Sequence, residues 1–392
     1  MNYNPLLPEV IANPYPYYTY LRRHAPVSQV DPHGWWVISR YDDIMFALKN
    51  YQLFSNANFF PVMTAGAFNP LADASVIVMV DPPVHTRLRK LANRAFTPRI
   101  IAALEPRIHE IARDILAEMT VKGTFDLMRD FAIPLPGQVI AELIGVEPER
   151  REDFRRWSDI FMAAMGGKVL DAYEQQDLAA FRTYFEYIIE RCRREPQRDL
   201  ISALVQAEEE GQQLTAGEVY NLAIVLLLAG NETTTNLIGN TALALLRHPQ
   251  ELAKVQGDPA LVLNLVEEGL RYDSPVHSEF RLATQDVPLG GVTIPAGATV
   301  LILYGSGNHD EDKFAEPQRF HVTRPNAPEN IAFGYGIHFC IGAPLARLEG
   351  KIAFEALLPL LSQVSWQEEQ LVRSLSFHQV RGLASFPMTV RR

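Results

Sequence analysis

The most regular pattern in the chain is a long apolar stretch between residues 214 and 249. Thr215 and Glu218 have the spacing of a capping box at its start, and Pro249 marks its end. A helix of roughly thirty-three residues would be on the order of 50 Å long. Because apolar residues occupy nearly every face, we expect this helix to cross the centre of the protein.

Helical patterns also dominate most of the remaining sequence. Asp81, which two prolines follow, predicts the start of a helix. Residues 52–80 show no clear element, and loops of such length are often functional. The pattern therefore predicts a mostly α-helical fold with small β-sheets, in a single domain that spans residues 1–392. Further helices are expected at about 260–272 and from Gly342 to about 360, and strands at 35–39, near 279–303 and close to the C-terminus.

Composition narrows the class of protein. The formal net charge of −10 disfavours nonspecific binding to nucleic acid or to anionic membranes, so we expect neither as a partner. The sequence shows no signal peptide and no run of eighteen apolar residues. Its two cysteines make no disulfide framework. We therefore expect a soluble, cytoplasmic protein that is a monomer.

Cys340 lies in the glycine-rich, aromatic segment FGYGIHFCIG, just before an expected helix. Glycines let a backbone turn sharply and approach a bulky group, and a helix N-terminus favours a thiolate. Zinc needs more ligands than Cys340 and His338 provide, whereas haem iron needs one axial protein ligand. From these residues alone, a buried inert cysteine and a Cys/His hydrolase both stay open as alternatives.

A second unusual segment, AGNETTT at residues 229–235, interrupts the long apolar helix. Burying polar groups is costly unless they are hydrogen-bonded. Single threonines commonly bond a carbonyl one turn earlier, but a cluster of three with a glutamate is less readily explained in this way.

Together these segments resemble the cytochrome P450 family. Residues 333–342 fill every fixed position of its haem-binding signature, which is Phe, Gly, any, Gly, any, His, any, Cys, any, Gly. Residues 229–235 resemble its oxygen-activation motif, and other family motifs recur in order over nearly the whole chain. The resemblance, which is to the soluble bacterial members, implies the cytochrome P450 fold. Haem b would then lie between the long central helix and the cysteine loop.

The resemblance also implies roles for single residues. Cys340 would be the axial ligand of the haem iron. Thr233 would be the catalytic hydroxyl beside dioxygen, Glu232 its acidic neighbour in proton delivery, and Thr234 a weaker candidate. Ala229 and Gly230 would leave room for dioxygen. The other implied cofactor contacts are the propionate-binding His85, Arg89, Arg281 and His338, together with Phe333 and Gly334.

Glu268 and Arg271 are three residues apart, so they share one face of a helix and can pair. The spacing alone favours an ordinary surface ion pair. The resemblance instead implies a structural role, because Glu-x-x-Arg is a hallmark of the family. Arg319, in the stretch PQRF, would complete the set.

Several segments that the family uses for substrate contact are rich in apolar residues. They predict a mid-sized, mainly apolar substrate, such as a steroid, terpenoid, fatty acid or polyketide. Gly166 and Gly167 would be flexible points of a lid. The predicted pocket residues are Phe59, Phe60, Val62, Met63, Phe68, Phe161, Met162, Met165, Leu226, Ala229, Val276, His277, Ser385 and Phe386.

The predicted function is that of a haem-thiolate monooxygenase with O2 as cosubstrate. Neither a Rossmann fingerprint nor a flavin domain is visible, so electrons from NAD(P)H would arrive through an external ferredoxin and its reductase. Arg87, Lys90 and Arg94 share a helix face and would help to dock the ferredoxin. A peroxide-driven peroxygenase and a non-catalytic thiolate-haem sensor remain as alternatives.

Overall fold

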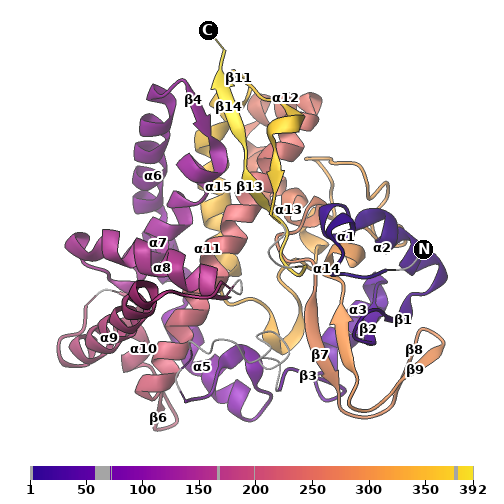
Figure 1. The fold of residues 1–392 in the computed structure, drawn as a ribbon, viewed down its shortest axis with the longest axis horizontal. Coiled ribbons are helices and arrows are strands. Elements are labelled where there is room, and N and C mark those ends of the chain that lie inside the picture. The colour runs from indigo at the N-terminus through magenta and orange to yellow at the C-terminus, as the bar shows by residue number, and fades with distance from the viewer. Residues whose placement is uncertain are drawn as a thin grey trace. The chain divides into compact units, whose positions relative to one another are not determined.

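The computed structural model describes residues 3–57, 71, 73–165, 168–197, 199–374 and 378–391, which form many helices and several small sheets (Figure 1). This confirms the expected fold class. The chain divides into two compact units. Unit 1 comprises residues 1–55, 107–135 and 233–392, and unit 2 comprises residues 56–106 and 136–232. The single domain expected over residues 1–392 stays a prediction.

A five-stranded sheet organises one part of unit 1. Its strand order is β1-β2-β10-β7-β3, and within it β2 and β10 run parallel while the other neighbours are antiparallel. Its apolar side chains pack with those of α3 in a buried core that includes Ile38, Ile44, Phe54 and Ile302. The elements are β1 (Val27–Val30), β2 (Trp35–Ile38), α3 (Tyr41–Lys49), β3 (Phe54–Ser55), β7 (Glu279–Ala283) and β10 (Thr299–Ile302).

Helices and smaller sheets make up the rest of unit 1. Helices α13 and α15 pack closely. A Cβ atom built at Gly350 of α15 would lie only 3.3 Å from Val266 of α13. The helices are α1 (Pro8–Ala12), α2 (Tyr15–His24), α12 (Pro249–Gly257), α13 (Val262–Tyr272), α14 (Tyr304–Gly307) and α15 (Ala343–Leu361). The strands are β4 (Thr124–Asp126), β8 (Val287–Leu289), β9 (Val292–Ile294), β11 (Val364–Ser365), β12 (Val372–Arg373), β13 (Leu383–Ser385) and β14 (Pro387–Val390).

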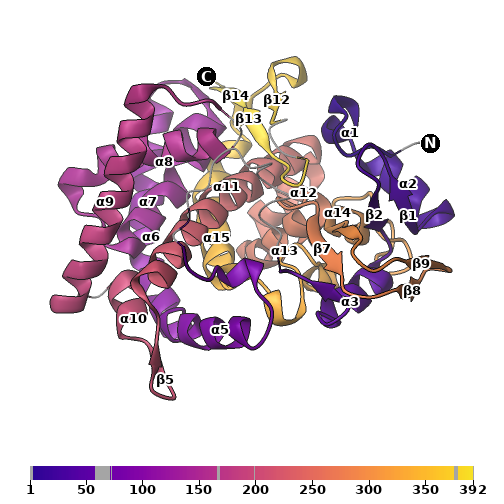
Figure 2. The same cartoon turned by 60° about the horizontal axis from the view of Figure 1, so that its bottom comes forward.

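Unit 2 is built mainly from helices. The short hairpin of β5 (Glu208–Glu209) and β6 (Gln212–Gln213) follows α10 and projects from it (Figure 2). Aromatic side chains of α8 and α9 pack together; the ring centroids of Phe161 and Phe181, for example, are 5.9 Å apart. The helices are α5 (Val84–Ala95), α8 (Arg151–Met165), α9 (Ala172–Arg194) and α10 (Leu200–Gln206). One boundary between the units follows β3, and the other three fall within α6 (Pro98–Val121), α7 (Pro134–Ile144) and α11 (Ala216–Arg247).

Helix α11 is the long apolar helix that the sequence predicts. The capping box is present, since the backbone N–H of Thr215 donates to Glu218 Oε2 at 2.9 Å and that of Glu218 donates to Thr215 Oγ1 at 3.2 Å. Among the described residues, α11 is the one helix long and apolar enough to span a membrane. However, 56% of its most apolar window is buried, which fits the core helix of a globular protein.

Candidate functional site

The loop that carries Cys340 is held in shape by two glycines. Gly334 and Gly336 have φ angles of 67° and 75°, a region that other residues rarely adopt. A Cβ atom at Gly336 would lie only 2.5 Å from the Leu48 carbonyl oxygen, so a larger residue does not fit. The Cys340 N–H donates to the Phe333 carbonyl at 3.0 Å and closes the loop.

The Cys340 thiol stands just before the first turn of α15, which begins at Ala343. The partial positive charge of a helix N-terminus favours a thiolate at such a position. The side chain is partly buried, and the ring of Phe339 in the same loop is 36% exposed. The loop therefore presents a sulfur ligand in a form that suits one axial bond to haem iron.

Arg281 on β7 is a buried cation in unit 1, the unit that also contains the Cys340 loop. The residue is 9% exposed, and its Nη1 donates to the Phe280 carbonyl at 2.6 Å. Within the described part of the chain, no ion pair joins Arg281 to an acidic side chain. Burial raises the pKa of the neighbouring Glu279 carboxyl, so that group is a weak counter-charge. A buried cation of this kind fits a carboxylate group such as a haem propionate.

The polar segment of α11 differs from the rest of that helix. Ala229 is exposed at mid-helix, whereas Thr234 and Thr235 are buried. The Thr235 hydroxyl donates to the Ala132 carbonyl at 3.0 Å, which gives it a packing role. Burial raises the pKa of Glu232, so its carboxyl holds a proton to higher pH than an exposed glutamate does.

His85 and Arg89 lie one turn apart on α5 in unit 2. His85 is buried, and burial lowers its pKa, with a further contribution from the Arg89 charge. At neutral pH the imidazole is therefore uncharged and offers one N–H donor. The pair presents a neutral donor and a cation on one helix face, which suits a carboxylate.

The family model for Cytochrome P450 matches residues 150–379 of the chain. The structure of CYP109Q5 from Chondromyces apiculatus superposes on this one with a TM-score of 0.92; that protein is 42% identical, and the match covers 100% of this chain and 98% of the other. The chain belongs to the cytochrome P450 family. Membership implies a haem iron cofactor and makes the protein a cytochrome P450 monooxygenase.

Two hydroxylases of known name are also similar to this chain over nearly its whole length. The vitamin D(3) 25-hydroxylase of Pseudonocardia autotrophica is 40% identical, with 96% of this chain and 94% of that protein covered. The 6-deoxyerythronolide B hydroxylase of Saccharopolyspora erythraea is 38% identical, with coverage of 93% and 95%. The hydrolase alternative for Cys340 has no support among these relatives.

The buried ion pair of this cytochrome P450 corrects one prediction. Glu268 and Arg271 are fully buried and form two bonds, of 2.7 and 2.8 Å. The second arginine on Glu268 is Arg324, whose Nε lies 3.2 and 3.1 Å from the two carboxylate oxygens. Arg319 has a side chain that is 54% exposed and pairs with Glu316. Arg319 contributes to the buried network around Glu268 through its backbone carbonyl, which accepts hydrogen bonds from Arg271 and Arg324.

Gly230, which was predicted to leave room for dioxygen, packs closely against a neighbouring helix. A Cβ atom at Gly230 would lie 2.8 Å from Cδ1 of Ile140 on α7. The space beside this glycine is therefore filled by an isoleucine of the neighbouring helix. The roles of Gly230 and Ala229 beside dioxygen stay predictions.

Two pairs of predicted pocket residues lie in unit 1, where His277 and Phe386 are buried and Val276 and Ser385 are partly buried. His277 is buried, with Nδ1 3.2 Å from the Tyr18 hydroxyl and Nε2 3.8 Å from Asp273. Its neighbour Val276 forms an isolated β-bridge with Val380.

The second pair lies at the end of β13. The Ser385 hydroxyl donates to Asp126, and the fully buried Phe386 packs edge-on against Trp366. In unit 2, Phe161 is likewise a buried core residue, whereas Leu226 is partly exposed. Several predicted residues lie outside the described part of the chain, or have side chains that do: Phe59, Phe60, Val62, Met63, Phe68, Gly166, Gly167, Met162 and Met165.

Two of the three cations predicted to dock the ferredoxin from α5 form ion pairs within unit 2. Arg87 pairs with Glu218, the glutamate of the α11 capping box, and Lys90 lies 3.3 Å from Glu210. These two cations are thus partly neutralised within unit 2. Arg94 is exposed near the end of the helix.

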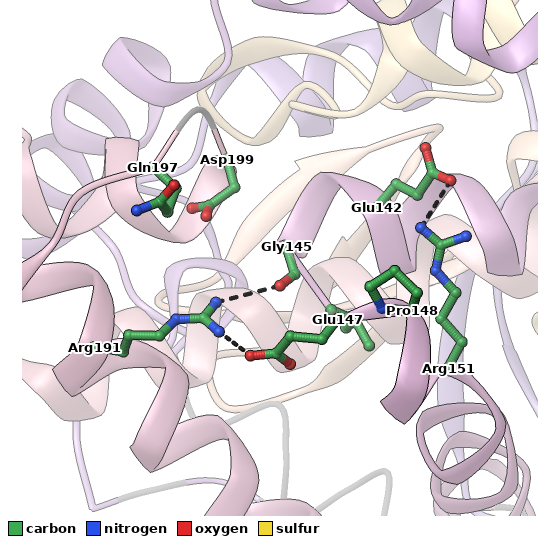
Figure 3. A pocket seen from close by; sticks show the side chains of 9 residues that line it. Glu142, Gly145, Glu147, Pro148, Arg151, Arg191, Gln197 and Asp199 are labelled. Atoms are coloured by element: carbon green, nitrogen blue, oxygen red, sulfur yellow. Dashed lines mark hydrogen bonds and ion pairs between the residues drawn. The ribbon is translucent and has the colours of Figure 1, made fainter.

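One hollow of about 470 Å³ lies in unit 2, between the ends of α7 and α9 and the start of α10 (Figure 3). Arg191 bonds Glu147 and the Gly145 carbonyl, and Arg151 pairs with Glu142 at 3.1 Å. Its arginines are therefore engaged with its own acidic groups, and none of its lining residues is a predicted site residue. The hollow is lined by Glu142, Gly145, Val146, Glu147, Pro148, Arg151, Arg191, Gln197 and Asp199.

Proposed function

We propose that this cytochrome P450 inserts one atom of O2 into a C–H bond of a mid-sized, mainly apolar substrate and releases the other atom as water. The observation that carries the proposal is the glycine-closed loop that presents the Cys340 thiol at the start of α15. The acid–alcohol pair Glu232–Thr233 supports a monooxygenase over a peroxide-driven enzyme or a sensor. Neither of those alternatives needs a proton donor for dioxygen.

Haem b, when bound, supplies the redox chemistry, and the protein supplies binding, orientation and protons. Cys340 would bind the iron through its thiolate. Thr233 would hold dioxygen in place, and the raised pKa of Glu232 suits a carboxyl that delivers protons. Ala229 would leave space beside them. The residues assigned to holding the haem are His85, Arg89, Arg281, Phe333, Gly334 and His338.

We expect the electrons to come from NAD(P)H through a ferredoxin and its reductase, in a cytoplasmic, monomeric protein. Lys90 and Arg94 are the exposed cations of the predicted docking face. Complementary charge mainly speeds association, and salt screens it. Reduction by an acidic ferredoxin should therefore slow as ionic strength rises, and a rate independent of salt would argue against this docking mode.

Replacing Cys340 by serine tests the proposed iron ligand. A neutral hydroxyl is a poor substitute for a thiolate. The wild-type protein, reduced and bound to CO, should show the red-shifted Soret band of thiolate-ligated haem, and the Cys340→Ser variant should lack it. Cys192→Ser is the matched control, because Cys192 is a buried residue of α9 in unit 2. A wild-type spectrum without that band would refute the proposal.

The relatives support a substrate of the size of a sterol or a macrolide. One is named for vitamin D(3) and another for 6-deoxyerythronolide B, both large and mainly apolar. Burying roughly 300 Å² of apolar ligand would contribute about 7 kcal/mol before the costs of ordering. A spin-state titration against steroids, terpenoids, fatty acids and macrolides should give tight binders. Tight binding of small charged metabolites, with none by these classes, would overturn this assignment.

A further inference from the structure

One carboxylate of α13 in unit 1 joins both ends of the segment that carries Cys340. Glu267 accepts from Nε of Arg347 at 2.5 Å and from its Nη2 at 3.3 Å. It also accepts from the side-chain amide of Asn330 at 2.9 Å. Asn330 precedes Cys340 and Arg347 follows it on α15, so the carboxylate bridges the entry and the exit of the loop.

The guanidinium that Glu267 binds lies over an aromatic ring of the same loop. Arg347 Cζ is 4.7 Å from the ring centroid of Phe333. Two hydrogen bonds to one carboxylate fix the plane of a guanidinium, which a single ammonium group would not allow. The Arg347 side chain is 34% exposed, so its contact with the ring is partly shielded from water. This is a cation–π pair, in which the cation is attracted to the electron-rich face of the ring.

Phe333 contacts the segment of the thiol in two ways. Its carbonyl accepts from the Cys340 N–H at 3.0 Å. Its ring packs against that of Phe339, the residue before Cys340, with centroids 6.4 Å apart. The next residue, Gly334, has a positive φ and few steric limits of its own. The backbone at this point is therefore held by what the Phe333 ring contacts, more than by its own conformational preference.

We infer that Arg347 is a positioning residue for the sulfur ligand, because it holds the Phe333 ring and thereby the hydrogen bond that closes the loop around Cys340. The inference rests on the proposed function, in which Cys340 binds the haem iron. Arg347 acts through Phe333, and Glu267 acts through Arg347. Groups outside the ligand shell of a metal commonly orient its ligands in this way.

Arg347→Gln removes the cation from the ring and keeps a polar side chain. The protein is reduced with dithionite and bound to CO, so that no ferredoxin takes part and docking has no effect. In urea below the unfolding transition of every variant, the red-shifted Soret band of thiolate-ligated haem should be lost roughly fivefold faster than in the wild type. That factor corresponds to about 1 kcal/mol, the size of one partly exposed cation–π contact.

Glu267→Gln separates positioning from the effect of charge alone. A nearby cation stabilises a thiolate and a nearby anion destabilises it. Charge alone would therefore make Arg347→Gln lose the band faster and Glu267→Gln lose it more slowly. Positioning predicts a faster loss in both variants, because an amide binds the guanidinium less firmly than a carboxylate does. A slower loss in Glu267→Gln would overturn the inference.

Lys49→Gln is the matched control, because it removes a cation from another ring of the same loop. Lys49 Nζ lies 5.4 Å from the ring centroid of Tyr335. Tyr335 is 44% exposed, so this contact is more open to water and should contribute little. The rate in Lys49→Gln should stay near the wild-type value. A loss as fast as that of Arg347→Gln would show that any cation beside the loop has this effect, and the inference would fail.

A double-mutant cycle with Phe333→Leu tests the route through the ring. In that background Arg347→Gln should change the rate little, because the ring it acts through is gone. An undiminished effect, or a wild-type rate in the single variant, would overturn the inference. If Phe333→Leu does not retain haem, the comparison of Arg347→Gln with Glu267→Gln still decides. A wild-type protein without the thiolate-haem band would instead overturn the proposed function, so the two failures are distinguishable.

Discussion

At the scale of single residues, proton delivery is the role proposed for Glu232 and Thr233. Glu232 and Thr233 are adjacent on α11, where the helix changes from buried apolar residues to a partly exposed polar segment. Because burial raises the pKa of Glu232, its carboxyl spends more time protonated at neutral pH than an exposed glutamate does. Such a group can release a proton and recover it within one catalytic cycle.

Replacing Thr233 by alanine should uncouple electron consumption from product formation. The variant should still consume reductant, but it should yield less product and more peroxide, because the hydroxyl proposed to hold dioxygen and pass protons is lost. Product formed per reductant, measured with a spin-shifting substrate, tests this. Thr234→Ala is the matched control, since Thr234 is buried and was only a weaker candidate. Unchanged coupling in Thr233→Ala would count against the proposed role.

At the scale of elements, one buried carboxylate joins α13 to the segment that follows it in unit 1. Glu268 accepts from two arginines and from the backbone N–H of His321 at 2.9 Å. Arg324 also donates to the carbonyl oxygens of Ala315, at 2.6 Å, and Arg319, at 3.0 Å. The loop over residues 315–324 is therefore tied to the helix through charged hydrogen bonds, which are the stronger kind.

Arg324→Met should destabilise the protein far more than Arg319→Met does. Removing one partner of a buried ion pair costs about 3–5 kcal/mol, because it leaves a charge poorly compensated. Exposed pairs such as Arg319–Glu316 contribute less than about 1 kcal/mol. The free energy of unfolding in urea, measured for both variants, tests the contrast. Equal losses would show that Arg319 shares the structural role.

At the scale of the whole molecule, several histidines are held neutral by burial. In unit 1 burial lowers the pKa of His309 well below its usual range, with a further effect of the Arg271 charge. Burial also lowers the pKa of His277, and that of His378 to about 4. The groups that act on His309 are Arg22, Arg271, Asp273 and the Tyr272 carbonyl, which His309 Nε2 meets at 2.7 Å.

The stability of the protein should therefore fall as the pH drops below about 6.5. These histidines have a lower pKa in the folded than in the unfolded state, so their contribution is fully present above the unfolded value and is lost as the pH falls toward the folded one. A buried histidine that stays neutral in the folded state lowers the free energy of unfolding by about 1.4 kcal/mol at pH 5.5 relative to high pH, because only the unfolded chain binds the proton. Urea unfolding of the wild type at pH 7.5 and 5.5 measures the loss.

His309→Gln should reduce the difference in unfolding free energy between these two pH values. The exposed His24 provides the control, because His24→Gln should leave the difference unchanged. If the His309 variant shows the full wild-type difference, the buried imidazole is not a source of the pH dependence.

The sequence by itself determined those features that depend on neighbours along the chain. The cysteine loop needs glycines with positive φ within a few residues of the thiol, and the capping box joins residues three apart. Both features can therefore be recognised from a short stretch of sequence. The apolar run predicted α11 because a helix with no polar face must be buried. Motif order then identified the family, which the matched relatives confirm.

Only the tertiary structure decided which distant residues meet. Arg319 and Arg324 are close in sequence, and packing against α13 selected the second as the partner of Glu268. Ile140 fills the space at Gly230, and the Tyr304 hydroxyl comes to lie beside Gly334 of the cysteine loop. The physical reason is that hydrogen bonds and packing act over a few ångströms in space, whatever the separation along the chain. Local patterns carry no record of which side chains the fold brings within that distance.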